Sequence, residues 1–257
     1  MIINYTQLNT IIHDSNLVLI DTRSYKEYSQ GHIPGAINLD LFAFHWFDTS
    51  KKGIENFNTQ TKALFSFAGI TNEKTVVFYD EVSGILAARG VWMLLYFSHP
   101  QVFLLDGGIQ KWKSENLPLE TKTNPFKQAK FSGIINDKLL VGYEYLKDNL
   151  DRVKIIDART TEEFDGTVVR AAKRGHIPGA VNVNWEKNIK SDGTLKNDKE
   201  LSELYKFSKD DEIITYCQGA YRAANTFVAL KKLGFKNVRV YLGSWGEWGN
   251  KPDLPAA

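Results

Sequence analysis

The sequence predicts an α/β protein made of two homologous domains, each a parallel sheet flanked by helices. Two observations lead to this prediction: an internal repeat that spans the chain, and an alternation of short β-branched runs with helical patterns inside each copy. The 257 residues are 43% hydrophobic and 24% charged, which suits two domains of ordinary size. This balance excludes collagen, an intrinsically disordered chain and a disulfide scaffold.

The repeat is clearest in two blocks. V-L-I-D-T-R from Val18 returns as K-I-I-D-A-R from Lys154, and G-H-I-P-G-A-I-N-L from Gly31 returns as G-H-I-P-G-A-V-N-V from Gly175. The second copy carries an eight-residue insertion between these two blocks. We therefore expect the two halves to share one fold, with an additional loop in the second half.

Two further blocks follow in the same order. The run T-V-V-F-Y-D that ends at Asp80 aligns with E-I-I-T-Y-C that ends at Cys217. G-G-I-Q-K-W from Gly107 aligns with G-S-W-G-E-W from Gly243. Four matched blocks in one order indicate two homologous domains, and they place an aspartate opposite a cysteine.

The boundary between the domains is expected in a stretch that contains Pro118 and Pro125 and lacks strong apolar periodicity. We predict a first domain over residues 1–122, a linker over 123–136, and a second domain, with the cysteine, over 137–257.

Short runs rich in β-branched residues predict four strands in each half, and because these runs are apolar on both alternating faces, the strands are expected to be covered on both sides. The predicted strands are residues 18–20, 36–39, 75–79 and 102–105 in the first half and 154–156, 180–183, 212–216 and 238–241 in the second. Helical patterns lie between them, among them 85–97 and 223–233, and Gly234 is expected to end the latter helix as its C-cap. Alternating strands and helices predict parallel sheets.

Net charge and apolar runs limit the partners that we expect. The formal charge is +2 from 32 basic and 30 acidic residues, too close to neutrality to indicate a nucleic acid partner. Residues 1–19 lack a cationic start with a long apolar run, and no later segment reaches the roughly 20 apolar residues that span a bilayer. We expect a cytoplasmic protein that binds neither nucleic acid nor membrane, and the oligomeric state stays open.

The chain contains a single cysteine, Cys217. One thiol cannot form an internal disulfide or supply a cysteine-based zinc site, so we expect no metal and no cofactor. A lone cysteine is most often a small buried hydrophobic residue, and the alternative is a nucleophile. The place of Cys217 in the sequence decides between the two.

Cys217 follows a predicted buried strand and precedes a predicted helix, and in parallel sheets ligands gather at the carboxyl ends of strands. A loop there can turn backbone N–H groups inward, and the helix N-terminus adds about half a positive charge, so the loop favours an anion. A thiol in this loop is expected to ionise easily and to act as a nucleophile. Arg222 is expected to hold an anionic substrate, the alternative being a first-turn arginine in solvent. The loop residues are Cys217, Gln218, Gly219, Ala220, Tyr221 and Arg222.

The first copy lacks the nucleophile, because the carboxylate of Asp80 cannot perform thiol chemistry. We interpret Asp80 as a helix cap. The histidines His32 and His176 lie in the two G-H-I-P-G-A turns, and because the copy without the cysteine retains its histidine, a structural role is expected for both.

At these residues the sequence resembles the tandem rhodanese-type sulfurtransferases, and the likeness covers nearly the whole chain. The pattern Y-x-x-x-H-I-P-G-A from Tyr28 is similar to that family's N-terminal signature, and G-S-W-G-E-W from Gly243 is similar to its C-terminal one. The resemblance implies an inactive first domain and an active second one, in which Cys217 forms a persulfide. It also implies a small anionic sulfur donor and a thiophilic acceptor, which is cyanide in vitro and a thiol or dithiol in the cell.

The loop composition favours thiosulfate as donor. In the family that the chain resembles, thiosulfate-using members tend to carry cationic residues in the loop, whereas 3-mercaptopyruvate-using members carry hydroxyls. This loop has no serine or threonine and ends in an arginine. Glu163 stands where many members have a substrate-binding arginine, and Arg159, Arg170 or Arg174 is expected to replace it. The predicted substrate-binding residues are Gln218, Gly219, Ala220, Tyr221, Arg222 and Arg174.

Two other functions remain open for the same fold. A rhodanese-like phosphatase would need five residues between cysteine and arginine, but this loop has only the four from Gln218 to Tyr221. A non-catalytic binding module would not need the intact cysteine loop. Both alternatives are therefore less favoured than sulfur transfer.

Overall fold

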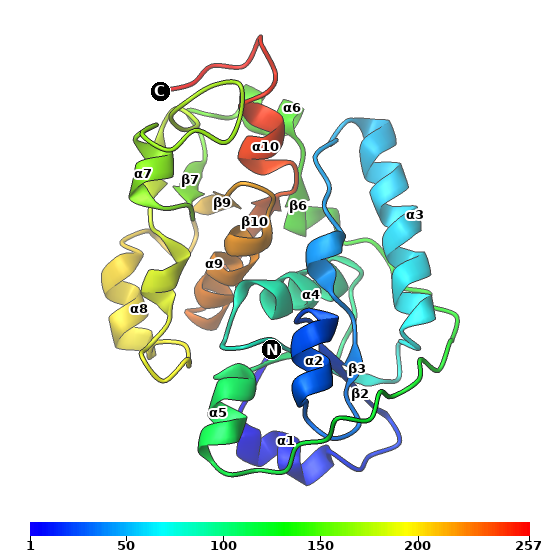
Figure 1. Cartoon of the computed structure of the whole chain (residues 1–257). Helices are drawn as coiled ribbons and strands as arrows, with labels where there is room; N and C mark the ends of the chain where they lie inside the picture. Colours follow the sequence, from blue (N-terminus) through cyan, green and yellow to red (C-terminus); the bar gives the residue numbers. More distant parts are fainter. The chain divides into compact units, whose positions relative to one another are not determined.

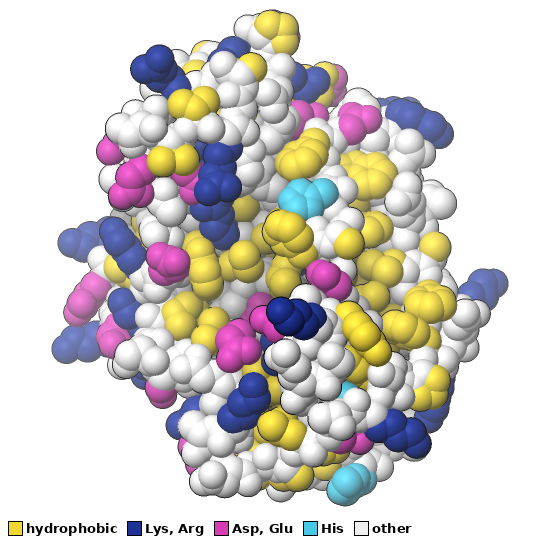
Figure 2. All heavy atoms as spheres, viewed as in Figure 1, with side chains coloured by type: hydrophobic (Ala, Val, Ile, Leu, Met, Phe, Trp, Pro, Cys, Tyr) yellow, Lys and Arg dark blue, Asp and Glu magenta, His cyan; other side chains and the backbone are white.

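The computed structural model describes residues 1–257, and the chain folds into two compact units (Figure 1). Each unit contains one five-stranded parallel sheet flanked by helices, which confirms the predicted α/β class and its duplication. The helices are all too short or too polar to cross a bilayer. On the face drawn in Figure 2, Lys and Arg side chains are interspersed with Asp and Glu, so no continuous basic surface covers that face.

The sheet of the first unit has the strand order β1-β5-β4-β2-β3, and every neighbouring pair is parallel. Its strands are β1 (Ile2–Ile3), β2 (Leu17–Asp21), β3 (Ile37–Asn38), β4 (Thr75–Tyr79) and β5 (Val102–Leu105). The helices of this half of the chain are α1 (Tyr5–Ile11), α2 (Tyr25–Gln30), the 3-10 helix η1 (Leu41–Ala43), α3 (Lys51–Phe67), α4 (Ile85–Tyr96) and α5 (Gly108–Ser114).

The sheet of the second unit has the order β6-β10-β9-β7-β8, which is the same order shifted by five strands. Its strands are β6 (Leu140–Val141), β7 (Lys154–Asp157), β8 (Ala180–Asn182), β9 (Glu212–Tyr216) and β10 (Asn237–Tyr241). Its helices are η2 (Asp137–Leu139), α6 (Tyr143–Asp148), α7 (Thr161–Phe164), η3 (Trp185–Asn188), α8 (Asp198–Leu204), α9 (Tyr221–Lys232) and α10 (Ser244–Trp248).

The predicted strands are all present, and each sheet has one further edge strand that the sequence pattern did not reveal. These strands, β1 and β6, are two residues long each, too short to show a period of two. Helix α9 begins two residues before the predicted start and is followed by Gly234, whose φ of +82° suits a glycine beyond a helix C-terminus. The central strands β4 and β9 are almost wholly buried, as their continuous apolar runs predict.

Two segments belong to the unit that is formed mainly by the other half of the chain. Residues 45–57 are part of the second unit, and residues 189–195 are part of the first. In the second unit the Glu247 carboxylate accepts hydrogen bonds from the amide of Thr49 at 2.9 Å and from its hydroxyl at 2.5 Å. In the first unit the carbonyl of Gly193 accepts a hydrogen bond of 2.8 Å from the loop after β4. Each exchanged segment is therefore held by hydrogen bonds inside its unit.

The two compact units are defined by contacts between residues, so their limits differ from a division of the sequence into two continuous halves. Residues 123–136, predicted as a linker, lie in the first unit together with most of residues 1–122. The division of the repeats at 122 and 137 stays a prediction.

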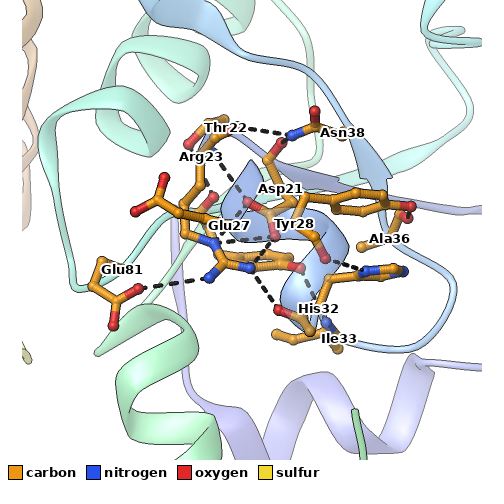
Figure 3. Close-up of polar contacts among 12 residues, drawn as sticks. Asp21, Thr22, Arg23, Glu27, Tyr28, His32, Ile33, Ala36, Asn38 and Glu81 are labelled. Atoms are coloured by element: carbon orange, nitrogen blue, oxygen red, sulfur yellow. Dashed lines mark hydrogen bonds and ion pairs between the residues drawn. The ribbon is translucent and has the colours of Figure 1, made fainter. Parts of the chain in front are cut away.

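A buried ion pair fixes the G-H-I-P-G-A turn of the first unit. Asp21 ends β2, and its Oδ2 lies 2.6 Å from Nη2 of Arg23 (Figure 3). The same nitrogen donates to the carbonyl of Gly31 at 2.9 Å. Two residues after Gly31, the amide of Ile33 donates to the hydroxyl of Tyr79, the last residue of β4, at 3.1 Å. The turn is thereby attached to the ends of two neighbouring strands.

The second unit repeats this arrangement. Asp157 Oδ2 lies 2.6 Å from Nη2 of Arg159, which donates to the carbonyl of Gly175 at 2.8 Å. The amide of Ile177 donates to the hydroxyl of Tyr216 at 3.1 Å. Both charged side chains are buried, so water cannot replace either partner.

The histidines of the two turns stack on aromatic rings. His32 lies on Tyr28 and His176 lies on Phe164, each with ring centroids 3.6 Å apart. In each pair the histidine Nδ1 is also within hydrogen-bonding distance of the backbone carbonyl of its aromatic partner, at 2.8 and 3.0 Å. The geometry agrees with the structural role that the sequence predicts for both.

Asp80 closes the loop between β4 and α4 of the first unit. Its carboxylate accepts hydrogen bonds from the amides of Gly84 and Leu86, both at 3.0 Å, and of Ala87 at 3.2 Å. Gly84 is the N-cap residue of α4, and the carboxylate of Asp80 satisfies amides of the first turn from four residues upstream, as a capping side chain does. Burial raises the pKa of Asp80 to about 6, although the three backbone hydrogen bonds oppose the shift.

Replacing Arg159 by methionine should lower the unfolding free energy by about 3–5 kcal/mol, because Asp157 would remain charged and buried without its partner. Urea denaturation followed by tryptophan fluorescence measures this loss. As a control, Lys52→Met removes the exposed ion pair with Glu55 and should cost under about 1 kcal/mol. A loss for Arg159→Met no larger than for the control would show that the buried pair does not fix the turn.

The unfolding free energy of the native chain should fall, relative to Asp80→Asn, as the pH rises from about 4 to about 7. The pKa of Asp80 in the folded state, about 6, lies above the ordinary value of 3.8, so the folded state binds this proton more tightly than the unfolded chain. The expected relative loss is about 3 kcal/mol. Denaturation curves at several pH values measure it, and a constant difference between the two proteins would contradict the shift.

Candidate active site

Cys217 lies between β9 and α9, directly after the last residue of the strand. The thiol is free and its side chain is almost completely buried, with 1% of the residue exposed. The loop turns into α9 at Ala220, whose φ of 65° and ψ of 6° are left-handed. Cys217 therefore lies three residues before the N-cap of a twelve-residue helix, at the helix N-terminus.

The G-S-W-G-E-W motif holds the start of this loop. The hydroxyl of Ser244 accepts a hydrogen bond from the amide of Cys217 at 3.2 Å, and the amide of Trp245 donates to the Cys217 carbonyl at 2.9 Å. The amide of Gly246 donates to the Gln218 carbonyl at 2.9 Å, and a Cβ on this glycine would stand only 2.8 Å from the same oxygen. The motif is thus the support of the cysteine loop, and its second glycine permits the close approach.

Arg222 is bound to Glu163 and also interacts with the thiol. Its Nη1 lies 2.5 Å from Oε2 of Glu163 and its Nη2 lies 3.0 Å from Oε1, a bidentate pair. Burial opposes the positive charge, but a hydrogen bond and Coulombic attraction from Glu163, together with similar interactions with Cys217, raise the pKa of Arg222. The guanidinium is paired with a buried carboxylate and only 16% of the Arg222 side chain is exposed, which excludes the alternative of a first-turn arginine in solvent.

Glu163 is itself held as a carboxylate by this pairing. Burial favours its neutral form, yet the hydrogen bond and charge of Arg222, with smaller contributions from Thr160 and Arg170, lower the pKa of Glu163. Only 2% of its side chain is exposed. The residue that stands at the position of the expected arginine is therefore an anion that binds two arginines.

The three arginines that were candidates for the substrate lie in different places. Arg159 is occupied by the buried pair with Asp157. Arg170 lies beside the cysteine loop, because Gln218 Nε2 donates to the Arg170 carbonyl at 3.1 Å and Arg170 Nε lies 3.3 Å from Glu163 Oε1. Arg174 lines a separate hollow next to Asp165, and no hydrogen bond or ion pair joins it to the loop.

The segment 45–57 contributes two aromatic side chains that the sequence analysis did not find. The imidazole Nδ1 of His45 lies 3.2 Å from the hydroxyl of Tyr221. A Cβ on Gly219 would stand 3.3 Å from the rings of both His45 and Phe47, so the absence of a side chain lets this segment approach the loop. No signal in the repeat could reveal these residues, because they are encoded in the half without the cysteine.

The predicted loop residues are thus brought together around one thiol. Gly219 and Ala220 form its backbone, Tyr221 lies under His45, and Arg222 interacts with the sulfur. This arrangement can hold a small anion next to a thiolate, because the helix N-terminus and the guanidinium both favour negative charge.

Known proteins are similar to this chain in sequence and in fold. It is 33% identical to a thiosulfate sulfurtransferase of Pseudomonas aeruginosa, over 93% of this chain and 90% of the relative. It is 32% identical to a thiosulfate sulfurtransferase of Azotobacter vinelandii, over 99% and 96% of the two chains. The crystal structure of SseA from Escherichia coli, described with the catalytic mechanism of 3-mercaptopyruvate sulfotransferases, matches at 30% identity and a TM-score of 0.80, over 95% and 98%.

The family model for the rhodanese-like domain matches twice, at residues 4–115 and at residues 143–251. The two matches fall on the two halves of the internal repeat, and they include the strand-to-helix loops that hold Asp80 and Cys217. Repeat, fold and family matches agree, and the chain belongs to the rhodanese family, with two rhodanese-like domains.

Proposed function

We propose that this protein is a thiosulfate sulfurtransferase in which Cys217 carries the transferred sulfur as a persulfide. The observation that carries the proposal is the place of the chain's single thiol directly before the N-terminus of α9, whose first turn carries Arg222. The curated relatives from Pseudomonas aeruginosa and Azotobacter vinelandii support it, since both are thiosulfate sulfurtransferases.

In the first half-reaction the thiolate of Cys217 attacks the outer sulfur of thiosulfate. A sulfur–sulfur bond forms to the cysteine, the sulfur–sulfur bond inside thiosulfate breaks, and sulfite leaves with the electron pair. Arg222 and the loop amides would stabilise the negative charge on the attacking and leaving groups.

In the second half-reaction a thiophilic acceptor attacks the outer sulfur of the persulfide. With cyanide, a carbon–sulfur bond forms, the persulfide bond breaks, and thiocyanate leaves while the Cys217 thiolate is regenerated. Thiols or dithiols would serve as acceptors in the cell by the same displacement. No redox cofactor is needed, because the two steps together exchange one sulfur atom between two nucleophiles.

3-Mercaptopyruvate is the second candidate donor, because SseA from Escherichia coli is 30% identical to this chain. Pyruvate would have to leave as an enolate, and this would need a proton donor close to the sulfur. The loop from Cys217 to Arg222 has no serine or threonine, whereas Arg222 offers a cation to a dianionic donor. These residues favour thiosulfate. A cytoplasmic location stays a prediction from the sequence.

Intact mass spectrometry after incubation with thiosulfate should show the gain of one sulfur atom, absent in Cys217→Ser. Dithiothreitol should remove the added mass, because a thiol is an acceptor. A gain with 3-mercaptopyruvate but not with thiosulfate would overturn the choice of donor. No gain with either would favour a non-catalytic binding module.

Hydrolysis of p-nitrophenyl phosphate should be negligible, because a loop with four residues between Cys217 and Arg222 is too short to surround a phosphate. Release of p-nitrophenolate is followed by absorbance, with Cys217→Ser as the blank. Turnover that this substitution abolishes would identify a phosphatase and contradict the sulfur-transfer proposal.

A further inference from the structure

The insertion that distinguishes the second repeat from the first reaches the cysteine loop and is fixed there by its backbone. The Arg170 carbonyl accepts a hydrogen bond from Gln218 at 3.1 Å. Two residues on, the amide of Ala172 donates to Asn250 Oδ1 at 2.8 Å, and the next amide donates to the carbonyl of Gly249 at 3.0 Å. The segment is thus anchored at both sides of residue 171.

The Arg170 side chain, in contrast, is directed toward solvent. Its side chain is 60% exposed, and the preceding residues Val168 and Val169 are 41% and 54% exposed. A fixed backbone with an exposed, charged side chain places a cation beside the cysteine loop without confining it to one rotamer.

The two arginines share one carboxylate unequally. Oε1 of Glu163 lies 3.0 Å from Nη2 of Arg222 and 3.3 Å from Nε of Arg170. Arg222 holds both carboxylate oxygens and is only 16% exposed, whereas Arg170 makes a single contact at the surface. The Arg170 contact is the weaker one, because it is single and longer and because water screens the largely exposed guanidinium. Arg170 can therefore leave Glu163 for another anion while Arg222 stays.

The charges beside the thiol leave one cation in excess. Two guanidinium groups face one buried carboxylate, and the N-terminus of α9 adds further positive potential. An oxyanion with two or three oxygens at one end matches the fork of donors on a guanidinium.

We propose that Arg170 is the specificity-determining residue that captures the oxyanion end of the sulfur donor, exchanging Glu163 for the donor as it enters. Glu163 is then a positioning residue, because it keeps Arg222 at the sulfur while Arg170 moves. The inference rests on the proposed sulfurtransferase function, since the donor is taken to be thiosulfate.

Alkylation of Cys217 tests the capture of anions without any sulfur transfer. Both iodoacetate and iodoacetamide react with the Cys217 thiolate and release iodide. Iodoacetate is an anion, whereas iodoacetamide is neutral. In Arg170→Gln the ratio of the two rate constants should fall by roughly 3- to 10-fold. Arg170→Lys should retain most of the ratio, and Arg152→Gln, the same charge change at an exposed arginine of this unit, should leave it unchanged.

Thiocyanate formation from thiosulfate and cyanide supplies the second readout. Arg170→Gln should raise the KM for thiosulfate about tenfold with little change in kcat, because one charged hydrogen-bonding partner of the donor is lost before the chemical step. An unchanged alkylation ratio together with an unchanged KM would overturn the proposal, as would losses in Arg174→Gln that are absent in Arg170→Gln.

The two readouts separate this inference from the proposed function. If the protein were not a sulfurtransferase, no variant would form thiocyanate, but the alkylation ratio would still fall in Arg170→Gln. If only the role of Arg170 were wrong, thiocyanate would form normally and the ratio would not move.

Discussion

The position of the Cys217 sulfur depends on a buried ion pair, Asp157 with Arg159, that does not contact it. Arg159 binds the aspartate at the end of β7 and the first glycine of the G-H-I-P-G-A turn, and that turn donates to the hydroxyl of Tyr216. Tyr216 directly precedes Cys217. The backbone amide of Trp245 donates to the cysteine carbonyl, and the indole of the same residue lies under the Arg159 guanidinium, 4.7 Å from ring centroid to Cζ. Since neither charge of the pair can be solvated, the end of β9 is held in one place.

The two units share one fold but carry different residues, Asp80 and Cys217, at the aligned position after the central strand. In the first, the carboxylate of Asp80 reaches the amides at the start of α4 and satisfies them itself. In the second, a thiol stands at the aligned position, and the first turn of α9 carries Arg222, which is paired with Glu163. The two loops thus differ in which group meets the helix N-terminus.

The sequence was sufficient for the duplicated fold and for the cysteine loop, because both depend on local runs and on their repetition. It could not reveal β1 and β6, because each is only two residues long and is defined by its pairing with a neighbouring strand. It also left open which arginine lies beside the cysteine loop, since Arg170 and Arg174 share one irregular segment and only the hydrogen bonds of that segment separate them. His45 and Phe47 escaped notice because contacts across more than 170 residues leave no periodic pattern.

The exchanged segments also affect how such a protein can evolve and fold. Duplication of a gene normally yields two copies that a later break can separate again. Here residues 45–57 complete the cysteine-bearing unit and residues 189–195 complete its counterpart, so neither half of the gene encodes a whole unit. During synthesis the segment around His45 leaves the ribosome long before its partners on β9 and α9. Each unit therefore depends on residues from both halves of the chain, and a break between the two repeats would leave both units incomplete.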